Sequence, residues 1–248
     1  MAGKVANFGN PNIAIIVNSC DEYKILWKPF FRLFKKYWKN CSYKIYLFSQ
    51  NPDIKEVEGL KRAGKWWSNS YRKALERIPE RYFIWADESG MLIKNVYTER
   101  VLDVFEILVK EDLTGVHFNA TERAKYKPLF EKNGKMYDKG LISLVTMKSN
   151  DYCISLQPSL WNKQRFIGFM KRNETIWEME KEGSKRASQE YDIVSPQTEK
   201  IMEVIDVTVE GKISQEGSEF LKLHGFNIRK GHLLKNIIKY PHKKCEQQ

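Results

Sequence analysis

The sequence lacks the features of a membrane-spanning, disulfide-rich or zinc-binding protein. No stretch approaches the roughly 18 consecutive apolar residues that a transmembrane helix needs. The start of the chain has no long apolar segment of the kind that forms a signal peptide. The four cysteines are scattered without CxxC spacing, which argues against a zinc site and against a disulfide framework. We therefore expect a cytoplasmic protein whose cysteines are reduced.

Acidic residues are in deficit, and this deficit predicts an anionic partner. Lys and Arg number 42 against 31 for Asp and Glu, which gives a formal net charge of +11. The basic residues are dispersed, and no helix-turn-helix, zinc-finger or RNP pattern accompanies them. Nucleic acid, a nucleotide diphosphate and an acceptor near an anionic membrane surface all fit this charge.

Internal repeats and low-complexity linkers are also absent, which favours one globular domain over residues 1–248. A length of 248 residues and a hydrophobic content of 42% suffice for one large core, which we expect at about 12–210. A basic tail follows at about 223–248, and it is a candidate for contact with an anionic membrane face.

Short apolar runs alternate along the chain with segments of helical periodicity, which is the pattern of an α/β protein. We expect a mixed, mostly parallel central sheet. Its strands should end near residues 17, 48, 86, 118, 157 and 209, with helices at 23–38, 69–77, 96–110 and 162–171 and a hairpin within 119–150. Because the carboxyl ends of strands in such sheets face the ligand crevice, functional side chains are expected directly after strands.

The strand at 81–86 ends in two carboxylates, Asp87 and Glu88, followed by Ser89 and Gly90. At the rim of a crevice these hard oxygen ligands suit Mg²⁺ or Mn²⁺, which usually bind one or two carboxylates plus substrate phosphates. The alternative is a strand that ends in a solvated acidic turn. On this motif alone the two interpretations are equally supported.

Two later segments combine aromatic and polar side chains. A strand is expected to reach Gln157 and to be stopped by Pro158, so that Trp161 opens the next helix. Further on, Glu178 and Glu180 lie two residues apart, sharing a face if the segment is extended and diverging if it is helical. A charged helix start is the alternative interpretation of this segment.

Several of these segments form an ordered set. They are Asn18-Ser19-Cys20-Asp21, Leu26-Trp27-Lys28-Pro29-Phe30-Phe31 with Tyr37-Trp38, Trp66-Trp67-Ser68, Asp87-Glu88, Ser155-Leu156-Gln157-Pro158 with Trp161, and Trp177-Glu178-Met179-Glu180 with Gly183-Ser184. Their order and spacing over about residues 12–190 resemble glycosyltransferases of the GT-A fold, specifically a group from bacteria and large DNA viruses that builds surface polysaccharides or glycans.

The resemblance implies a single GT-A, Rossmann-like domain and a nucleotide-diphosphate-sugar donor of the UDP or GDP type. Asp87 and Glu88 would take the place of the family's DxD motif and hold the Mn²⁺ or Mg²⁺ that bridges the donor phosphates, although the third position is Ser89. His232 is a further candidate ligand, with a solvated turn residue as the alternative. The remaining donor-binding candidates are Val17, Asn18, Ser19, Asp21, Arg62, Lys65, Trp66 and Arg72, of which the three cations also fit ordinary surface residues and the tryptophan a packing role.

The same resemblance implies transfer of a hexosyl or pentosyl group with inversion, in which a carboxylate deprotonates the attacking acceptor hydroxyl. Glu180, or failing that Glu178, is the expected base. Gln157, Trp161 and Trp177 are expected to position the acceptor or the donor sugar, because an aromatic ring suits the apolar face of a pyranose. The acceptor is expected to be a glycan or a lipid-linked molecule in polysaccharide biosynthesis, with no nucleic acid as partner.

Two other functions remain open on the sequence alone. A nucleic-acid-binding basic protein would use the charge of +11 and would bind with a steep salt dependence, indifferent to Mn²⁺. A catalytically inactive GT-A relative would bind a sugar or act as a scaffold, which the imperfect DxD motif allows. The acidic strand end and the segment 177–180 favour the enzyme over the nucleic-acid binder, because the latter needs neither.

Overall fold

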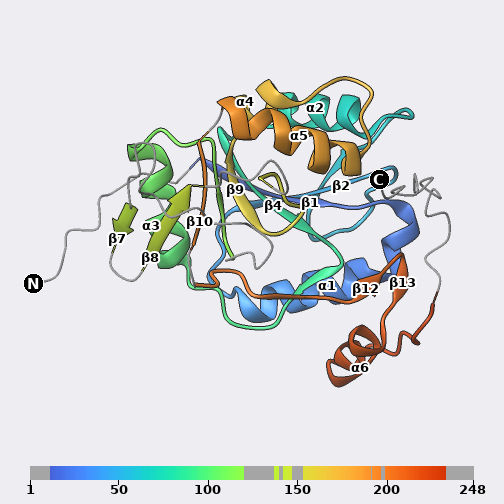
Figure 1. Ribbon diagram of the computed structural model, residues 1–248. Coiled ribbons are helices and arrows are strands. Elements are labelled where there is room, and N and C mark those ends of the chain that lie inside the picture. The colour runs from blue at the N-terminus through green and yellow to red at the C-terminus, as the bar shows by residue number, and fades with distance from the viewer. Residues whose placement is uncertain are drawn as a thin grey trace, which may run out of the picture.

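A nine-stranded mixed sheet in the order β3-β2-β1-β4-β9-β6-β10-β8-β7 forms the centre of the molecule (Figure 1). The computed structural model describes residues 12–119, 137–139, 142–146, 153–190, 192–196 and 199–232. Within this sheet only β8 and β9 run against the other strands, so the predicted mostly parallel α/β sheet is confirmed. The strands are β1 (Ile13–Asn18), β2 (Lys44–Ser49), β3 (Glu58–Lys61), β4 (Tyr82–Asp87), β6 (Gly115–His117), β7 (Tyr137–Lys139), β8 (Ile142–Thr146), β9 (Ser159–Asn162) and β10 (Ile193–Pro196).

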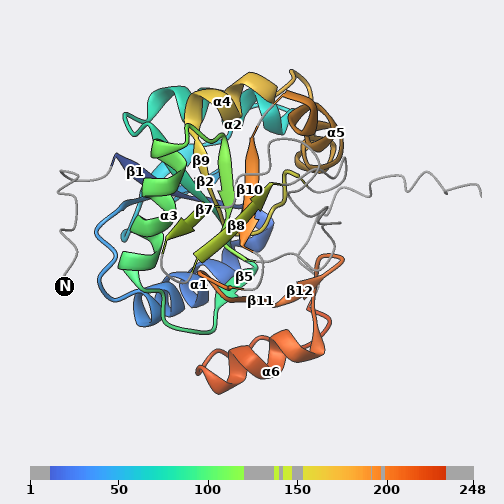
Figure 2. The same ribbon diagram turned by 60° about the vertical axis from the view of Figure 1, so that its left-hand side comes forward.

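Helices cover both faces of the sheet (Figure 2). One face packs against α1 (Lys24–Tyr37) and α3 (Thr98–Lys110), and the other against α2 (Trp67–Arg77), α4 (Lys163–Phe169) and α5 (Ile176–Glu190). Successive side chains of a strand point to opposite faces. Accordingly Ile15 and Val17 of β1 join the core with α1 and α3, whereas Ala14 and Ile16 join the core with α2, α4 and α5.

The sequence of α1 explains both the helix and its orientation. Leu26, Phe30, Leu33 and Phe34 recur at helical spacing and are at most 4% exposed. Trp27, Pro29 and Phe31 between them are buried as well, and the charged side chains of Lys28 and Arg32 face outward. A short 3-10 turn, η1 (Asp21–Tyr23), links the end of β1 to this helix.

A small two-stranded ribbon, β5 (Gly90–Leu92) with β11 (Val204–Asp206), lies beside α1 (Figure 2). Its antiparallel register places Asp206 opposite Gly90. The hairpin of β12 (Thr208–Val209) and β13 (Lys212–Ile213) follows, and then α6 (Gln215–Leu223). A side chain at Gly217 would collide with the backbone of Val207, so this glycine lets α6 pack closely on the residue that joins β11 to β12.

Several expectations about elements are wrong. The segment 153–158 contains no strand, and β9 instead begins directly after Pro158, because proline is tolerated at the start of a strand. Trp161 therefore lies inside β9 and does not open a helix. The expected strand reaching residue 209 is divided into β11 and β12, and β3 is a strand of the sheet that was not expected.

One further expectation agrees with the structure, and others concern residues that the structure does not describe. The antiparallel pairing of β7 with β8 confirms a hairpin within 119–150, and the rest of that segment lies outside the described residues. The same is true of the expected basic tail from residue 233 onward. None of the helices in the described part of the chain has the length and apolar character that crossing a lipid bilayer requires.

Candidate active site

Four parallel strand ends meet at one edge of the sheet. The register aligns Asn18 of β1 with Asp87 of β4, and Ser49 of β2 with Lys61 of β3. Because ligands of open α/β sheets bind outside the carboxyl ends of the strands, this edge is the expected crevice. We call it the carboxyl edge.

Asp87 is held in one orientation by the turn that follows it. Its Oδ1 accepts hydrogen bonds from the backbone N–H of Ser89 at 2.8 Å, the Ser89 hydroxyl at 2.7 Å and the N–H of Gly90 at 3.3 Å. None of the hydrogen bonds among the described residues uses Oδ2. Ser89, which departs from the DxD pattern, thus orients Asp87 by supplying donors.

A second carboxylate reaches this turn from a distant part of the sequence. Asp206 ends β11, and its pairing opposite Gly90 brings its charge close to Asp87. Gln157 Nε2 donates to Asp206 Oδ2 at 3.4 Å. Sequence reasoning missed Asp206, although it ends the short apolar run Val204-Ile205. The antiparallel pairing of β5 with β11, which the sequence pattern does not reveal, decides where this run ends in space.

The two carboxylates repel each other. Burial raises the pKa of Asp87 and the charge of Asp206 raises it further, and together these effects outweigh the lowering by hydrogen bonds from Ser89 and Gly90. The side chain of Asp206 is exposed, but partial desolvation by the surrounding protein raises the pKa of its carboxyl group. The hydrogen bond from Gln157 lowers this pKa by a smaller amount. A cation between the two groups would relieve this repulsion.

Glu88 is buried, in contrast to the exposed Asp206, which corrects its assignment as a metal ligand. It is only 5% exposed, and its neighbours are Ser19, which hydrogen-bonds to it, and Cys20 and Tyr23, whose pKa values its charge raises. Burial, followed by the charge of Asp87, raises the pKa of Glu88 well above its ordinary value. Glu88 is therefore a buried acid next to the loop that follows β1.

The residues present fit a divalent ion only in part. Among the described residues, no group of three or more His, Cys, Asp and Glu side chains is arranged to hold a metal ion. Two carboxylates nevertheless suffice for Mg²⁺ or Mn²⁺ when substrate phosphates complete the coordination. His232 is exposed and bonded through its backbone to Arg229 and Ile213, and no described contact links its ring to either carboxylate.

The end of β1 carries a buried amide next to Asp87. Asn18 is 4% exposed, and its Nδ2 lies 3.4 Å from the carbonyl oxygens of Ile16 and Ala86. Its Oδ1 is buried and accepts no hydrogen bond from the described residues. By contrast, the Val17 side chain is fully buried in the core, so only its backbone reaches the edge. The Ser19 hydroxyl accepts from Trp27 Nε1 at 2.7 Å.

Asp21 ties together the loops that follow β1 and β2. Its Oδ1 accepts from the Ser49 hydroxyl at 2.7 Å and from the Asn51 N–H at 2.8 Å, and its Oδ2 accepts from the Asn51 side chain. Burial raises the pKa of Asp21, but the hydrogen bonds from Asn51 and Ser49 outweigh it, so the net pKa is lowered. The carboxylate thus fixes these two loops to each other at the carboxyl edge.

Of the three cations expected at the donor, Arg62 lies at the carboxyl edge and Lys65 is a surface residue. The backbone of Arg62 bonds to Ser49 at 2.7 Å, which places Arg62 at the carboxyl edge. Lys65 is exposed, and its Nζ lies 4.8 Å from the ring centre of the half-buried Trp66. The neighbouring Trp67 is 4% exposed and stacks on Tyr71 at 4.7 Å, so the packing interpretation holds for this tryptophan.

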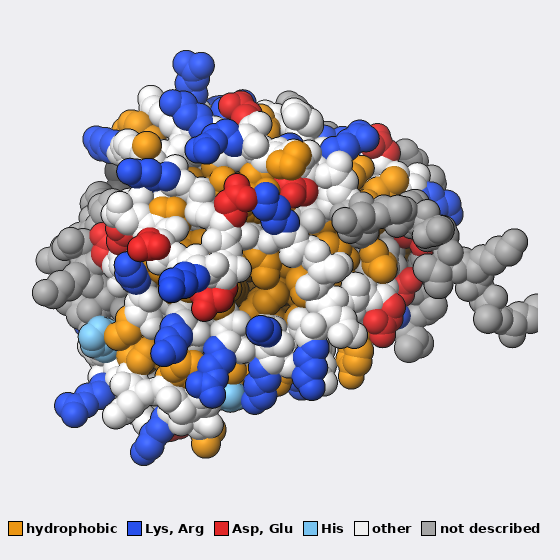
Figure 3. All heavy atoms as spheres, turned by 180° about the vertical axis from the view of Figure 1, so that it is seen from behind, with side chains coloured by type: hydrophobic (Ala, Val, Ile, Leu, Met, Phe, Trp, Pro, Cys, Tyr) orange, Lys and Arg blue, Asp and Glu red, His pale blue; other side chains and the backbone are white. Residues whose placement is uncertain are grey.

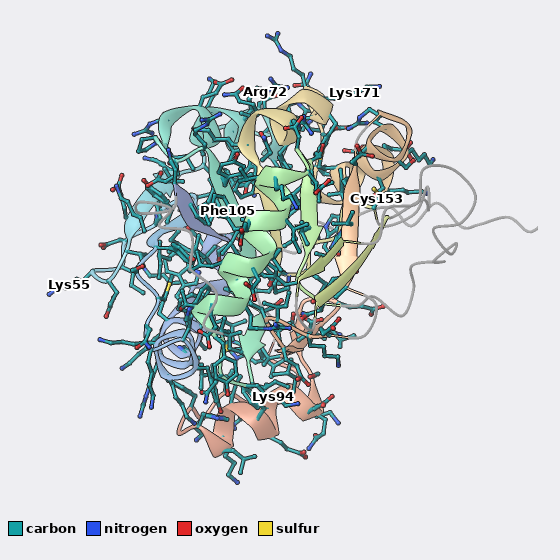
Figure 4. The ribbon with its side chains drawn as sticks, turned by 90° about the vertical axis from the view of Figure 1, so that its left-hand side faces the viewer. Lys55, Arg72, Lys94, Phe105, Cys153 and Lys171 are labelled. Carbon is teal, nitrogen blue, oxygen red and sulfur yellow. The ribbon has the colours of Figure 1, made fainter. Side chains whose placement is uncertain are left out.

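Arg72 is a structural residue, which corrects its assignment to the donor. Its Nη2 donates to the carbonyl oxygens of Ile167 at 3.0 Å and Met170 at 2.9 Å, so it closes the end of α4. Figure 4 shows Arg72 and Lys171 at the same end of the molecule, opposite to Lys94.

Of the residues expected to act on the acceptor, Glu180 is bonded next to Gln157 in the chain. Glu180 Oε1 accepts from the Leu156 N–H at 3.1 Å, one residue before the Gln157 that bonds to Asp206. Glu178 instead forms a capping box with Thr175, through bonds of 2.8 Å and 3.1 Å. The segment is helical, so the two carboxylates diverge, and the helix-start interpretation holds for Glu178.

The two tryptophans expected near the sugar differ in exposure. Trp177 is 52% exposed on α5. Trp161 is fully buried and packs edge-on against Phe166, with ring centres 5.1 Å apart. A side chain at Gly115 would collide with its ring, so the core leaves no room beside it. Trp161 is therefore a core residue and cannot position a sugar.

Comparisons with known proteins identify the fold. No protein-family model and no curated protein matches the sequence. A mannosyltransferase from Pyrobaculum calidifontis, solved in complex with GDP-Man and Mn²⁺, matches with a TM-score of 0.51 and 9% identity over 82% of this chain and 59% of that chain. This likeness confirms the predicted nucleotide-sugar-transferase (GT-A) architecture.

Two further structures match at lower TM-scores. TarS 1-349 of S. aureus matches with a TM-score of 0.45 and 8% identity over 76% of this chain and 58% of that chain. The bifunctional IspDF of Campylobacter jejuni matches with a TM-score of 0.46 and 14% identity over 78% of this chain and 52% of that chain. This chain spans less than two thirds of the length of all three structures.

Proposed function

We propose that the protein is a metal-dependent glycosyltransferase that moves a sugar from a UDP- or GDP-type donor to a hydroxyl group of a glycan or lipid-linked acceptor, with inversion. One observation carries this proposal: Asp87, oriented by Ser89 and Gly90, faces the charge of Asp206 at the carboxyl edge of the sheet. The fold is shared with a mannosyltransferase solved with GDP-Man and Mn²⁺, which supports a donor of this type.

Asp87 and Asp206 would hold Mn²⁺ or Mg²⁺ together with the donor phosphates. At that position the ion would neutralise the negative charge that develops on the diphosphate leaving group. Ser89 keeps Asp87 in place, and Gln157 does the same for Asp206 through its hydrogen bond. Residues that orient metal ligands in this way are expected to matter nearly as much as the ligands.

Asn18 is our candidate for contact with the nucleotide base or ribose. A buried acceptor without a partner is costly, and a donor group of a ligand would satisfy it. Arg62 lies at the same edge and is the predicted cation best placed for the phosphates.

Glu180 is our candidate for the general base that receives the proton of the acceptor hydroxyl. Its hydrogen bond from Leu156 fixes the carboxylate beside Gln157, and the exposed Trp177 precedes Glu180 by three residues on α5, on the same side of the helix. Trp177 would then contact the apolar face of a sugar.

The matched variants Glu180→Gln and Glu178→Gln test this assignment. Release of nucleotide diphosphate from a donor panel, with Mn²⁺ and acceptor present, should fall about 10²- to 10⁴-fold for Glu180→Gln. Glu178→Gln should stay near wild type, because glutamine also completes a capping box. Turnover retained in Glu180→Gln contradicts the assignment.

A catalytically inactive, sugar-binding relative is the second candidate. It is favoured by the finding that the described residues contain no cluster of three metal-ligating side chains. The same assay separates the two functions, because such a protein would bind a donor without releasing nucleotide diphosphate under any acceptor condition.

A further inference from the structure

The exposed face of α1 carries only cationic charge. Lys24, Lys28, Arg32, Lys35 and Lys36 point outward from the helix, and Lys39 follows directly after it; we call these six residues the basic face. The helix contains no acidic residue. Apart from Lys24, whose charge acts on Asp21, these cations make no ion pair with any described residue.

The segment after α6 extends this face. Arg32 lies over the Phe226 ring at 5.4 Å, and Tyr37 Oη lies 3.2 Å from His224 Nε2, so the segment packs on α1. Three more exposed cations lie nearby: Lys222 in the last turn of α6, and Arg229 and Lys230 in the segment after it. Figure 3 shows Lys and Arg side chains gathered on the rear of the molecule at the level of α1 and α6.

Apolar side chains are exposed among these charges. Leu223 is 84% exposed at the end of α6, and Ile25 is 41% exposed on α1 between Lys24 and Lys28. Contact with a phosphate backbone would not remove the apolar surface of Leu223 and Ile25 from water, whereas insertion among lipid headgroups would remove it and stabilise binding. The aromatic residues of α1 are buried or, for Tyr37, half-buried, so this helix offers no exposed ring on which unpaired bases could stack.

We propose that the basic face docks the protein on a membrane surface rich in anionic phospholipids, with Ile25 and Leu223 entering the headgroup layer. The 14 residues of α1 extend over about 21 Å, enough to present its cations together to a flat surface. The sequence beyond residue 232 contains four Lys and one Glu, so its net positive charge does not complement this face. Because α1 packs against β5, docking would hold the carboxylate pair at the membrane. The docking does not depend on the proposed function.

Sedimentation with lipid vesicles tests the proposal. Vesicles of phosphatidylcholine with added phosphatidylglycerol should bind the protein, phosphatidylcholine alone should not, and binding should weaken as salt rises above about 0.1 M. The variant Lys28→Gln/Arg32→Gln/Lys35→Gln should bind about 100-fold less, at roughly fivefold per cation. Leu223→Ser should lower binding severalfold with no change in charge.

The matched control removes the same charge from the opposite side of the molecule. Lys73, Arg77 and Lys171 are exposed on α2 and after α4, and Figure 4 shows Lys171 at the end away from Lys94. The variant Lys73→Gln/Arg77→Gln/Lys171→Gln should keep most of the vesicle binding. Equal losses in the two triple variants would show an effect of net charge alone and overturn the proposal. Absence of vesicle binding, or binding of duplex nucleic acid by the basic face in its place, would also overturn it.

Discussion

The aromatic layer between the sheet and α2 differs from the carboxyl edge in the contacts that its side chains make: apolar rings pack in the layer, whereas like charges lie near each other at the edge. In the layer, Trp67 stacks on Tyr71, Tyr71 packs edge-on against Phe166, and the ring of Tyr71 has no exposed surface. At the carboxyl edge, Asp87 and Asp206 are held near each other with raised pKa values. The aromatic layer stabilises the fold. The carboxyl edge destabilises it, because two carboxylates lie close together without the cation and phosphates that would neutralise them.

The largest effect on stability is expected in the aromatic layer. Trp161→Ala should lower the free energy of unfolding by about 3–5 kcal/mol, because a fully buried ring is replaced by a cavity. Denaturant unfolding followed by circular dichroism measures this loss. Trp177→Ala, at a half-exposed ring, should cost less than about 1 kcal/mol. Similar losses for both tryptophans would remove the distinction between the two regions.

An intermediate effect is expected at Arg72. Arg72→Met should lower the free energy of unfolding by about 1–3 kcal/mol, because two backbone carbonyl oxygens at the end of α4 lose their donor. The exposed Arg77 on the same helix provides the control, and Arg77→Met should change stability by no more than about 0.5 kcal/mol. Donor KM should be unchanged in both variants. A raised donor KM for Arg72→Met alone would return this residue to the donor site.

The smallest and opposite effect is expected at the carboxylate pair. Because the pKa of Asp87 is raised in the folded state, ionising this group lowers the stability of the protein. The loss is complete at a pH above the folded-state pKa and absent at a pH below the unfolded-state pKa of about 3.9. Asp206→Asn should therefore raise Tm at neutral pH, and this gain should disappear as pH falls through that window. Melting curves over a pH series measure it. A Tm lowered by the substitution at neutral pH would show that the pair is not in electrostatic conflict.

The parts of the fold that local pattern determines were predictable. The run at 13–17 and the helical spacing of Leu26, Phe30 and Leu33 gave β1 and α1 nearly to the residue, and the carboxylate after β4 was placed correctly at the carboxyl edge. Sequence could not supply Asp206, because the short ribbon of β5 and β11 exists only through long-range pairing. It also could not tell the buried Trp161 from the exposed Trp177, since exposure depends on how β9 and α5 pack.

The most direct test is the Tm of wild-type protein and of Asp206→Asn with a panel of UDP- and GDP-sugars, each with and without Mn²⁺. A ligand that binds only the folded state raises Tm by mass action. The wild type should show a rise with one donor only when Mn²⁺ is present, and Asp206→Asn should lose this rise although its own Tm is higher. The matched surface variant Glu210→Gln, an exposed acid on the neighbouring hairpin, should keep the rise. An identical Mn²⁺-dependent rise in Asp206→Asn and wild type would contradict the assignment of the carboxylate pair as the donor site.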